Sequence, residues 1–244
     1  MEATSTAHIG ILSPATPDRP HFKSLDAILP AGVSIAHEGL GLLGESYQDL
    51  VGKSDQVIER AKAFCERHKV SGVMLTGGFV TLFNPGLEAK VSAAIGLPVA
   101  SAVSSAVTAL TTFGAKQVLL MTPFDAASDA VIKNHLNSLD LTVYLGPSFE
   151  NRKAGSALKL SPDELFKLVK TSFDASPAAE AIYFQGATMD PLPIIQRLED
   201  SLGVPVVTSN SAMIWNLLSK LGLRYSVKNC GRLLNEWPAV GSRA

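Results

Sequence analysis

The sequence predicts an α/β protein built from two similar lobes, each a parallel sheet flanked by helices. Short apolar runs rich in Val, Ile and Leu alternate with longer segments of helical period, which is the pattern of parallel strands covered on both faces. A strand and glycine turn near the middle of the first half recur in the second half, which favours two related units over a solenoid of many repeats. The chain has 244 residues, of which 46% are hydrophobic, so it can bury one or two sizeable cores.

Hydrophobic periodicity defines the first elements along the chain. Six of them are predicted in this order: strands at 8–13 and 33–36, a helix at 54–68, and strands at 73–75, 116–121 and 181–184. In the helix, Val57, Ala61 and Phe64 recur at helical spacing. Ser54 is its expected N-cap, because a hydroxyl there can accept a free N–H of the first turn.

The internal repeat predicts how the chain divides into lobes. VMLTGG at 73–78 and IGLPVASAVSSA at 95–106 correspond to IYFQGA at 182–187 and LGVPVVTSNSA at 202–212. Gly78 and Gly186 are 108 positions apart, and Gly96 and Gly203 are 107 apart, so the register is nearly constant. We therefore expect a first lobe over 1–102, completed by 214–244, and a second lobe over 103–213.

The charge and cysteine content exclude several classes of protein. Lys and Arg number 21 against 22 Asp and Glu, so the chain lacks the basic footprint of a nucleic-acid binder or of a protein drawn to anionic membranes. The first residues lack the pattern of a signal peptide, and the apolar runs are too short to cross a bilayer. Two distant cysteines and five scattered histidines show no metal-type spacing. We expect a cytoplasmic protein without a metal site.

Both glycine turns follow a strand, where open parallel sheets bind ligands. Helix N-termini at that edge present free N–H groups and a partial positive charge to anions. LTGGF lacks the Gly-Lys-Ser/Thr ending of a nucleotide-binding P-loop. If the two lobes face each other, their turns meet in one cleft, and the expected ligand is a small carboxylate.

Several segments resemble the aspartate/glutamate racemase superfamily, and within it the arylmalonate decarboxylases and maleate isomerases. They are HIGILSPAT, HEGLGLLGESY, LTGGFVTLFNPG, GLPVASAVSSAVTAL, LLMTPFD, LGVPVVTSNSAMIW and CGRL. The resemblance implies two pseudo-symmetric α/β lobes, an active site between them, and neither a metal nor an organic cofactor. It also implies a catalytic cysteine in one or both turns, but the matching positions here are Gly77 or Gly78 and Gln185 or Gly186. Cys65 and Cys230 lie elsewhere and are expected to be structural.

The resemblance also implies a set of substrate-binding positions. They are Pro14, Leu40, Leu42, Leu43, Thr76, Gly77, Gly78, Phe79, Val80, Phe124, Gln185, Gly186 and Ala187. Phe124 stands where the decarboxylases carry a tyrosine hydroxyl, so one donor to the substrate is missing, and Thr122 is not expected to replace it. What remains is a cradle of backbone N–H groups and hydroxyls that can stabilise an anion.

Without a thiol in either turn, another group has to carry the proton. His37 ends a predicted strand beside the HEGLGL segment, and histidine is the residue type that most readily carries protons at neutral pH. The alternative interpretation of His37-Glu38 is a solvated pair. Asp190 follows the second turn, and its alternative role is to cap the next helix. His37 and then Asp190 are the expected proton carriers.

The sequence thus predicts a cofactor-independent lyase that decarboxylates a small carboxylic acid through a carbanion or enolate. A cis–trans or double-bond isomerase using His37 or Asp190 is the alternative enzyme, and a silent small-acid-binding protein is the alternative outside enzymes. The expected partner is the small-molecule carboxylate alone. The oligomeric state stays open, with a homo-oligomer compatible with the sequence.

Overall fold

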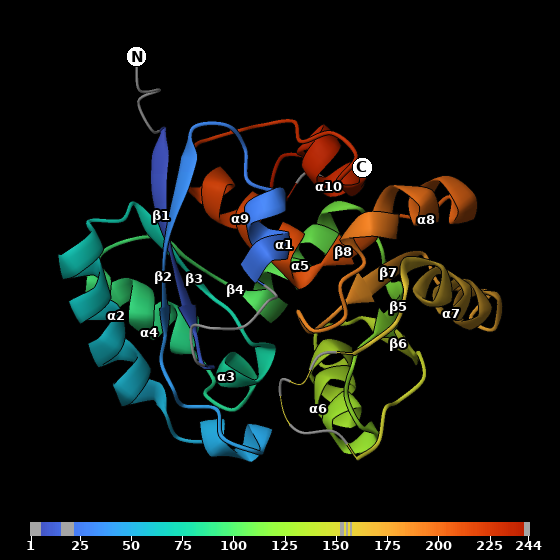
Figure 1. Cartoon of the computed structure of the whole chain (residues 1–244), viewed down its shortest axis with the longest axis horizontal. Helices are drawn as coiled ribbons and strands as arrows, with labels where there is room; N and C mark the ends of the chain where they lie inside the picture. Colours follow the sequence, from blue (N-terminus) through green and yellow to red (C-terminus); the bar gives the residue numbers. More distant parts are fainter. Residues whose placement is uncertain (1–5, 16–21, 152–153, 155, 157, 242–244) are drawn as a thin grey trace.

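Two four-stranded parallel sheets form the frame of the molecule (Figure 1). The computed structural model describes residues 6–15, 22–151, 154, 156 and 158–241. The strand order is β2-β1-β3-β4 in the first sheet and β6-β5-β7-β8 in the second, so the second half of the chain repeats the order of the first. The predicted two-lobed α/β fold is confirmed.

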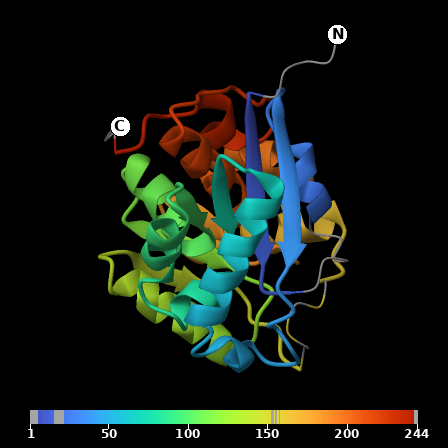
Figure 2. The ribbon, with the colours of Figure 1, turned by 90° about the vertical axis from the view of Figure 1, so that its left-hand side faces the viewer.

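The first lobe contains the first sheet and the helices around it. Its elements are β1 (Ala7–Ser13), α1 (Phe22–Ala27), β2 (Val33–Gly39), η1 (Tyr47–Leu50), α2 (Ser54–His68), β3 (Gly72–Leu75), α3 (Gly78–Leu82), α4 (Leu87–Ile95), β4 (Val99–Ser101) and α5 (Ala102–Thr112). Seen from the side, α2 runs alongside β1 and β2 (Figure 2). β3 is buried along its whole length, as a strand covered on both faces requires.

The second lobe repeats this arrangement, and its last helix but one returns to the first sheet. Its elements are β5 (Gln117–Met121), α6 (Ala126–Asn137), β6 (Thr142–Leu145), α7 (Pro162–Asp174), β7 (Ala181–Phe184), η2 (Leu192–Ile194), α8 (Ile195–Leu202), β8 (Val206–Thr208), α9 (Ser209–Lys220) and α10 (Gly231–Glu236). No helix in the described ranges is long and apolar enough to cross a membrane.

Helices α5 and α9 join the two lobes. They pack against each other, and each contacts β4 of the first sheet and β8 of the second. α9 also lies close over β3, where a Cβ on Gly72 would be only 2.9 Å from Leu217 Cδ1. At the end of α9, Lys220 donates to the Val99 carbonyl at 2.6 Å and to Glu88 at 3.0 Å. One hydrophobic core consequently runs through both lobes.

Strand alternation divides the side chains of the second sheet between two cores. Tyr183 faces the core shared with the first lobe, whereas Ile182 and Phe184 face a second core under α7 and α8. This is the two-residue period of a strand buried on both sides.

Two local predictions need correction. β2 is three residues longer than predicted and ends at Gly39, because it continues to pair with β1 up to Ser13. The N-cap of α2 is Lys53, which makes no side-chain cap hydrogen bond, whereas the Ser54 hydroxyl donates to Asn84 at 3.3 Å. The predicted lobes are 1–102 completed by 214–244, and 103–213. These limits stay a prediction, and the one between 213 and 214 falls inside α9.

Candidate active site between the lobes

A cavity of about 80 Å³ lies where the two glycine turns meet. The first lobe contributes the end of β1 and the turn between β3 and α3. The second contributes the turn after β7 and the first residues of α9. As expected, the cavity lies at the carboxyl ends of parallel strands from both sheets.

The first-lobe turn brings the backbone very close to the end of β1. Thr76 N–H donates to the Leu12 carbonyl at 3.0 Å, which ties the turn to the strand. Gly77 has a φ of 74°, and a Cβ there would lie 2.6 Å from Pro14 Cγ. Both the left-handed backbone and the close contact require glycine.

The second-lobe turn is built in the same way. Gln185 N–H donates to the Met121 carbonyl at 3.0 Å. Gly186 has a φ of 108°, and a Cβ there would lie 2.7 Å from Phe124 Cζ and 2.8 Å from Pro123 Cδ. The turn therefore packs directly against the loop that carries Phe124.

Most of the predicted substrate-binding residues line this cavity. Those that do are Pro14, Leu43, Thr76, Gly77, Gly78, Phe79, Phe124, Gln185, Gly186 and Ala187. The other three support the walls from behind. Leu40 and Leu42 donate backbone hydrogen bonds to the Ser13 and Pro14 carbonyls, and Val80 is buried within α3.

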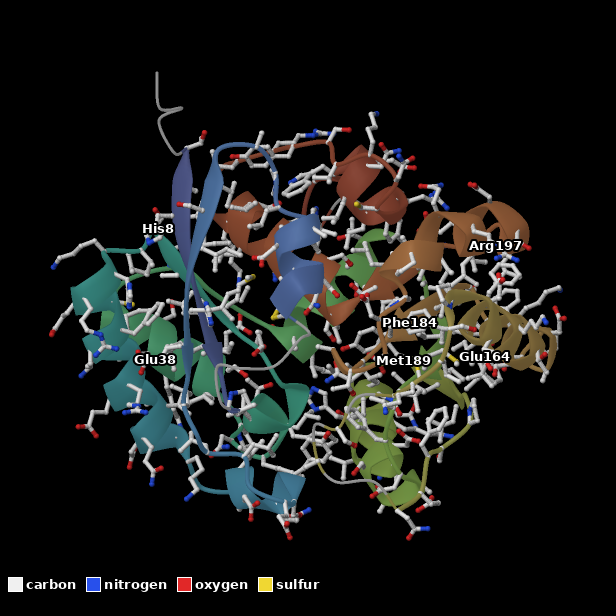
Figure 3. All side chains as sticks on the ribbon, viewed as in Figure 1. His8, Glu38, Glu164, Phe184, Met189 and Arg197 are labelled. Atoms are coloured by element: carbon white, nitrogen blue, oxygen red, sulfur yellow. The ribbon has the colours of Figure 1, made fainter. Side chains whose placement is uncertain are left out.

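The two predicted proton carriers lie outside the cavity lining. His37 is an exposed residue inside β2, opposite Ile11 of β1, and its neighbour Glu38 pairs with Arg67. Figure 3 shows Glu38 on the first lobe, well away from Phe184 at the end of β7. The sequence placed His37 at a strand end, whereas strand pairing continues past it.

Asp190 is held by other contacts. Its carboxylate accepts from the Ser24 hydroxyl at 2.6 Å and from Leu192 N–H at 3.1 Å, the latter as the capping interpretation predicts. It lines an adjoining, smaller cavity of about 30 Å³ and not the one between the turns, although the two cavities share Gly186, Ala187, Ser209 and Asn210. A proton-carrying role for His37 or Asp190 stays a prediction that this geometry disfavours.

Sequence reasoning missed nine residues of the lining. They are Ser13, Ala15, Leu25, Tyr47, Ala102, Thr188, Ser209, Asn210 and Met213. Ser209 and Asn210 belong to the Ser/Thr-rich segment that opens α9, so the repeat contained a signal for them. Leu25 and Tyr47 come from segments outside the repeat, and only the tertiary fold brings them here.

A family model of arylmalonate decarboxylase matches residues 9–234 of this sequence. The chain belongs to the arylmalonate decarboxylase family. The resemblance to the aspartate/glutamate racemase superfamily is thereby confirmed.

Among individual relatives, the maleate isomerase of Geobacillus stearothermophilus is 27% identical over 138 residues, which are 57% of this chain and 55% of that isomerase. The chain thus matches about half the length of that relative.

Solved structures show the same fold over nearly the whole chain. A liganded double mutant of arylmalonate decarboxylase has a TM-score of 0.83 at 22% identity, covering 95% of this chain and 100% of that one. The maleate isomerase Iso from Pseudomonas putida S16 has a TM-score of 0.80 at 16% identity, covering 95% and 99%.

In this member of the arylmalonate decarboxylase family, aromatic rings form one wall of the cavity. Tyr47 stacks on Phe79 with ring centroids 4.3 Å apart, and Phe124 meets both rings edge-on at 5.2 Å. Such offset and edge-to-face pairs hold one another in place. The wall is apolar, and within it Tyr47 of η1 lies against Phe124.

The cavity lining also carries neutral hydrogen-bonding groups. Asn210 lies in the first turn of α9, and its side-chain amide has no hydrogen-bond partner among the described residues. Thr188 and Ser209 add hydroxyls. Because the N-terminus of a long helix favours negative charge, this part of the lining suits an anion.

The described lining residues include no Asp, Glu, Lys, Arg, His or Cys, and Tyr47 is their one ionisable side chain. Cys65 lies in α2, and Cys230 lines the smaller cavity beside Asp190. Burial raises the pKa of both thiols, so they are poor thiolates at neutral pH. No three His, Cys, Asp or Glu side chains gather as metal ligands in the part of the chain that the structure describes.

Proposed function

We propose that this protein is a cofactor-free enzyme that decarboxylates a small carboxylic acid. The observation that carries the proposal is the cavity between the lobes, where both glycine turns, an apolar wall and a row of neutral donors converge. Membership of the arylmalonate decarboxylase family supports it. An arylmalonate is the substrate class that the family name suggests.

The polar and apolar parts of the lining suit different parts of such a substrate. Donors such as Gln185 and Asn210 bind the carboxylate that is kept, together with the oxygen that becomes negative as the enolate forms. A preorganised donor of this kind lowers an oxyanion transition state by about 3–4 kcal/mol. The carboxylate that leaves faces the rings of Tyr47, Phe79 and Phe124, where it loses solvation.

The step itself needs only one proton. The bond from the α-carbon to the departing carboxylate breaks, carbon dioxide leaves, and the electron pair stays on the α-carbon as a carbanion or enolate. A proton then bonds to that carbon. Because no cysteine is among the described lining residues, we propose that the Tyr47 hydroxyl delivers the proton and recovers it from water.

The matches to maleate isomerases favour cis–trans isomerisation as the second candidate. That reaction moves no carbon out of the substrate, so its products separate the two proposals. Purified protein incubated with phenylmalonate, an arylmalonate, is expected to release carbon dioxide and phenylacetate. NMR spectra recorded during the incubation measure the formation of phenylacetate. Conversion of maleate to fumarate without decarboxylation would instead establish the isomerase. Tight binding of either acid without turnover would identify a silent binding protein.

A further inference from the structure

Gln185 is one of the two positions, with Gly186, that match the catalytic cysteine implied by the resemblance, and it is almost completely buried, with 2% of its surface exposed. Its side-chain oxygen accepts hydrogen bonds from the hydroxyls of Tyr183 and Ser209, the latter at 2.6 Å. Tyr183 has no exposed surface. Burial raises the pKa of the Tyr183 hydroxyl, so it stays protonated and able to donate.

The contact lengths decide which end of the amide faces these hydroxyls. A separation of 2.6 Å between Ser209 and Gln185 is typical of an O–H···O bond and shorter than N–H···O bonds usually are. The oxygen of Gln185 therefore faces the hydroxyls, and its nitrogen faces the other way.

The amide nitrogen of Gln185 reaches across to the first lobe. A Cβ on Gly78 would lie 2.1 Å from this nitrogen and 2.9 Å from Val103 Cγ2. The nitrogen has no acceptor among the described residues, although Gln185 and Gly78 both line the cavity. Although the side chain as a whole is almost completely buried, its nitrogen is not among the described side-chain atoms that are buried without a partner, so it is open to the cavity, where a ligand oxygen can accept from it.

We propose that Gln185 is a fixed hydrogen-bond donor to a carboxylate or enolate oxygen in the cavity, with Tyr183 and Ser209 as positioning residues that hold its amide. The proposal rests on the proposed function for the class of ligand. The side-chain amide of Asn210, which lines the same cavity, would be a second donor for the same group. A neutral amide stabilises an anion but does not give up its proton, so Gln185 binds the substrate and does not protonate it.

The test compares two probes that have nearly the same shape, phenylacetate and its neutral counterpart phenylacetamide, by calorimetric titration. The wild-type protein is expected to bind phenylacetate at least tenfold more tightly. Gln185→Met should weaken phenylacetate binding by about 10- to 100-fold, the usual effect of losing a hydrogen bond to a charged group, with little change for phenylacetamide. Gln196→Met is the matched control, because Gln196 is a half-buried glutamine on α8 that lines neither cavity and donates a solvent-exposed hydrogen bond to Asp200.

The positioning residues have their own readout. Tyr183→Phe and Ser209→Ala should each reduce the preference for phenylacetate over phenylacetamide while leaving phenylacetamide affinity unchanged. A merely structural role would weaken both probes equally.

A second measurement needs no substitution. In wild-type protein labelled with [¹⁵N]glutamine, phenylacetate should shift one pair of side-chain amide signals and phenylacetamide should not. Equal binding of the two probes, or no amide response, would overturn the proposal.

Decarboxylation of phenylmalonate is measured separately from binding. Turnover that does not depend on Gln185 would exclude the donor role of Gln185 but leave the proposed decarboxylase in place. Selective binding of phenylacetate through Gln185 without turnover would exclude the proposed decarboxylase activity but leave the donor role of Gln185 in place.

Discussion

At the scale of single residues, the site depends on where small side chains permit close approach. Gly186 combines a left-handed backbone with a contact that leaves no room for a Cβ against Phe124 and Pro123. Gly52 also has a positive φ, of 69°, but nothing lies within 4 Å of a Cβ built on it. A substitution at Gly52 therefore tests backbone strain alone, whereas a substitution at Gly186 tests backbone strain together with the contact that shapes the cavity.

Alanine at these two glycines should have different consequences. Gly52→Ala is expected to lower the free energy of unfolding by about 1–2 kcal/mol through strain alone, with ligand binding intact. Gly186→Ala should also displace the Phe124 loop and weaken carboxylate binding more than tenfold. Urea unfolding and calorimetric titration measure the two effects. Unchanged binding in Gly186→Ala would place the ligand elsewhere.

The source of the proton is also a question about single side chains. Tyr47→Phe should lower turnover about 10²- to 10⁴-fold with substrate affinity largely preserved, because the hydroxyl is lost and the aromatic wall remains. His37→Gln and Asp190→Asn should keep near-full turnover, since neither residue lines the cavity. A large loss in either of these would restore the residue as a proton carrier. Full turnover in all three would leave solvent as the donor, with a nearly racemic product wherever a stereocentre forms.

At the scale of elements, the loop between β5 and α6 is held by a buried carboxylate. Asp129 in α6 accepts hydrogen bonds from Thr122 and, at 2.7 Å, from Ser148, and Thr122 in turn accepts from Phe124 N–H at 3.1 Å. Burial raises the pKa of Asp129 above its usual value, although both hydroxyl donors oppose the shift. This chain of contacts fixes the loop that carries Phe124 into the cavity.

The raised pKa predicts a pH dependence of stability. The folded state binds the proton of Asp129 more tightly than the unfolded state does, so this contribution is complete below the unfolded pKa of about 3.9 and is lost as pH rises through the folded pKa. The stability of the wild type relative to Asp129→Asn should therefore decrease from pH 3 towards neutral pH in urea unfolding. Glu180→Gln is a control of opposite sign, because backbone N–H donors lower the pKa of Glu180. A rising difference for Asp129 would contradict the assignment.

Elements defined by local sequence patterns were predictable, whereas features that depend on contacts between distant segments were not. Both glycine turns were predictable because a strand, a turn and a second strand recur locally and in register. The position of His37 was not, because the length of β2 depends on its pairing with β1, which is a contact between distant segments. Tyr47 was missed for a related reason, since its packing on Phe79 joins two elements that no local pattern connects.

At the scale of the whole molecule, the two lobes are repeats in backbone but not in chemistry. The first turn contributes a bare glycine at Gly78, and the second contributes the long side chain of Gln185, which fills the space that Gly78 leaves. The shared core through α5 and α9 makes the lobes one packed unit. The site therefore depends on both lobes at once.

The proposed chemistry uses neither a thiol nor a metal, and reagents that act on the intact protein test this. Alkylation of Cys65 and Cys230 under native conditions, or their replacement by alanine, should leave turnover nearly unchanged, and so should exhaustive chelation. Activity and far-UV circular dichroism are measured together. Loss of turnover on mild alkylation with the spectrum intact would refute the thiol-free account.

The position of α9 has a consequence for how the protein is made. This helix follows the last strand of the second sheet, yet it covers β3 and β4 of the first. During synthesis on the ribosome, the first sheet is complete more than a hundred residues before α9 emerges. Until then, Gly72 and β3 lack the contact with Leu217 that α9 makes in the folded protein, so the nascent first lobe exposes an apolar surface that chaperones can bind.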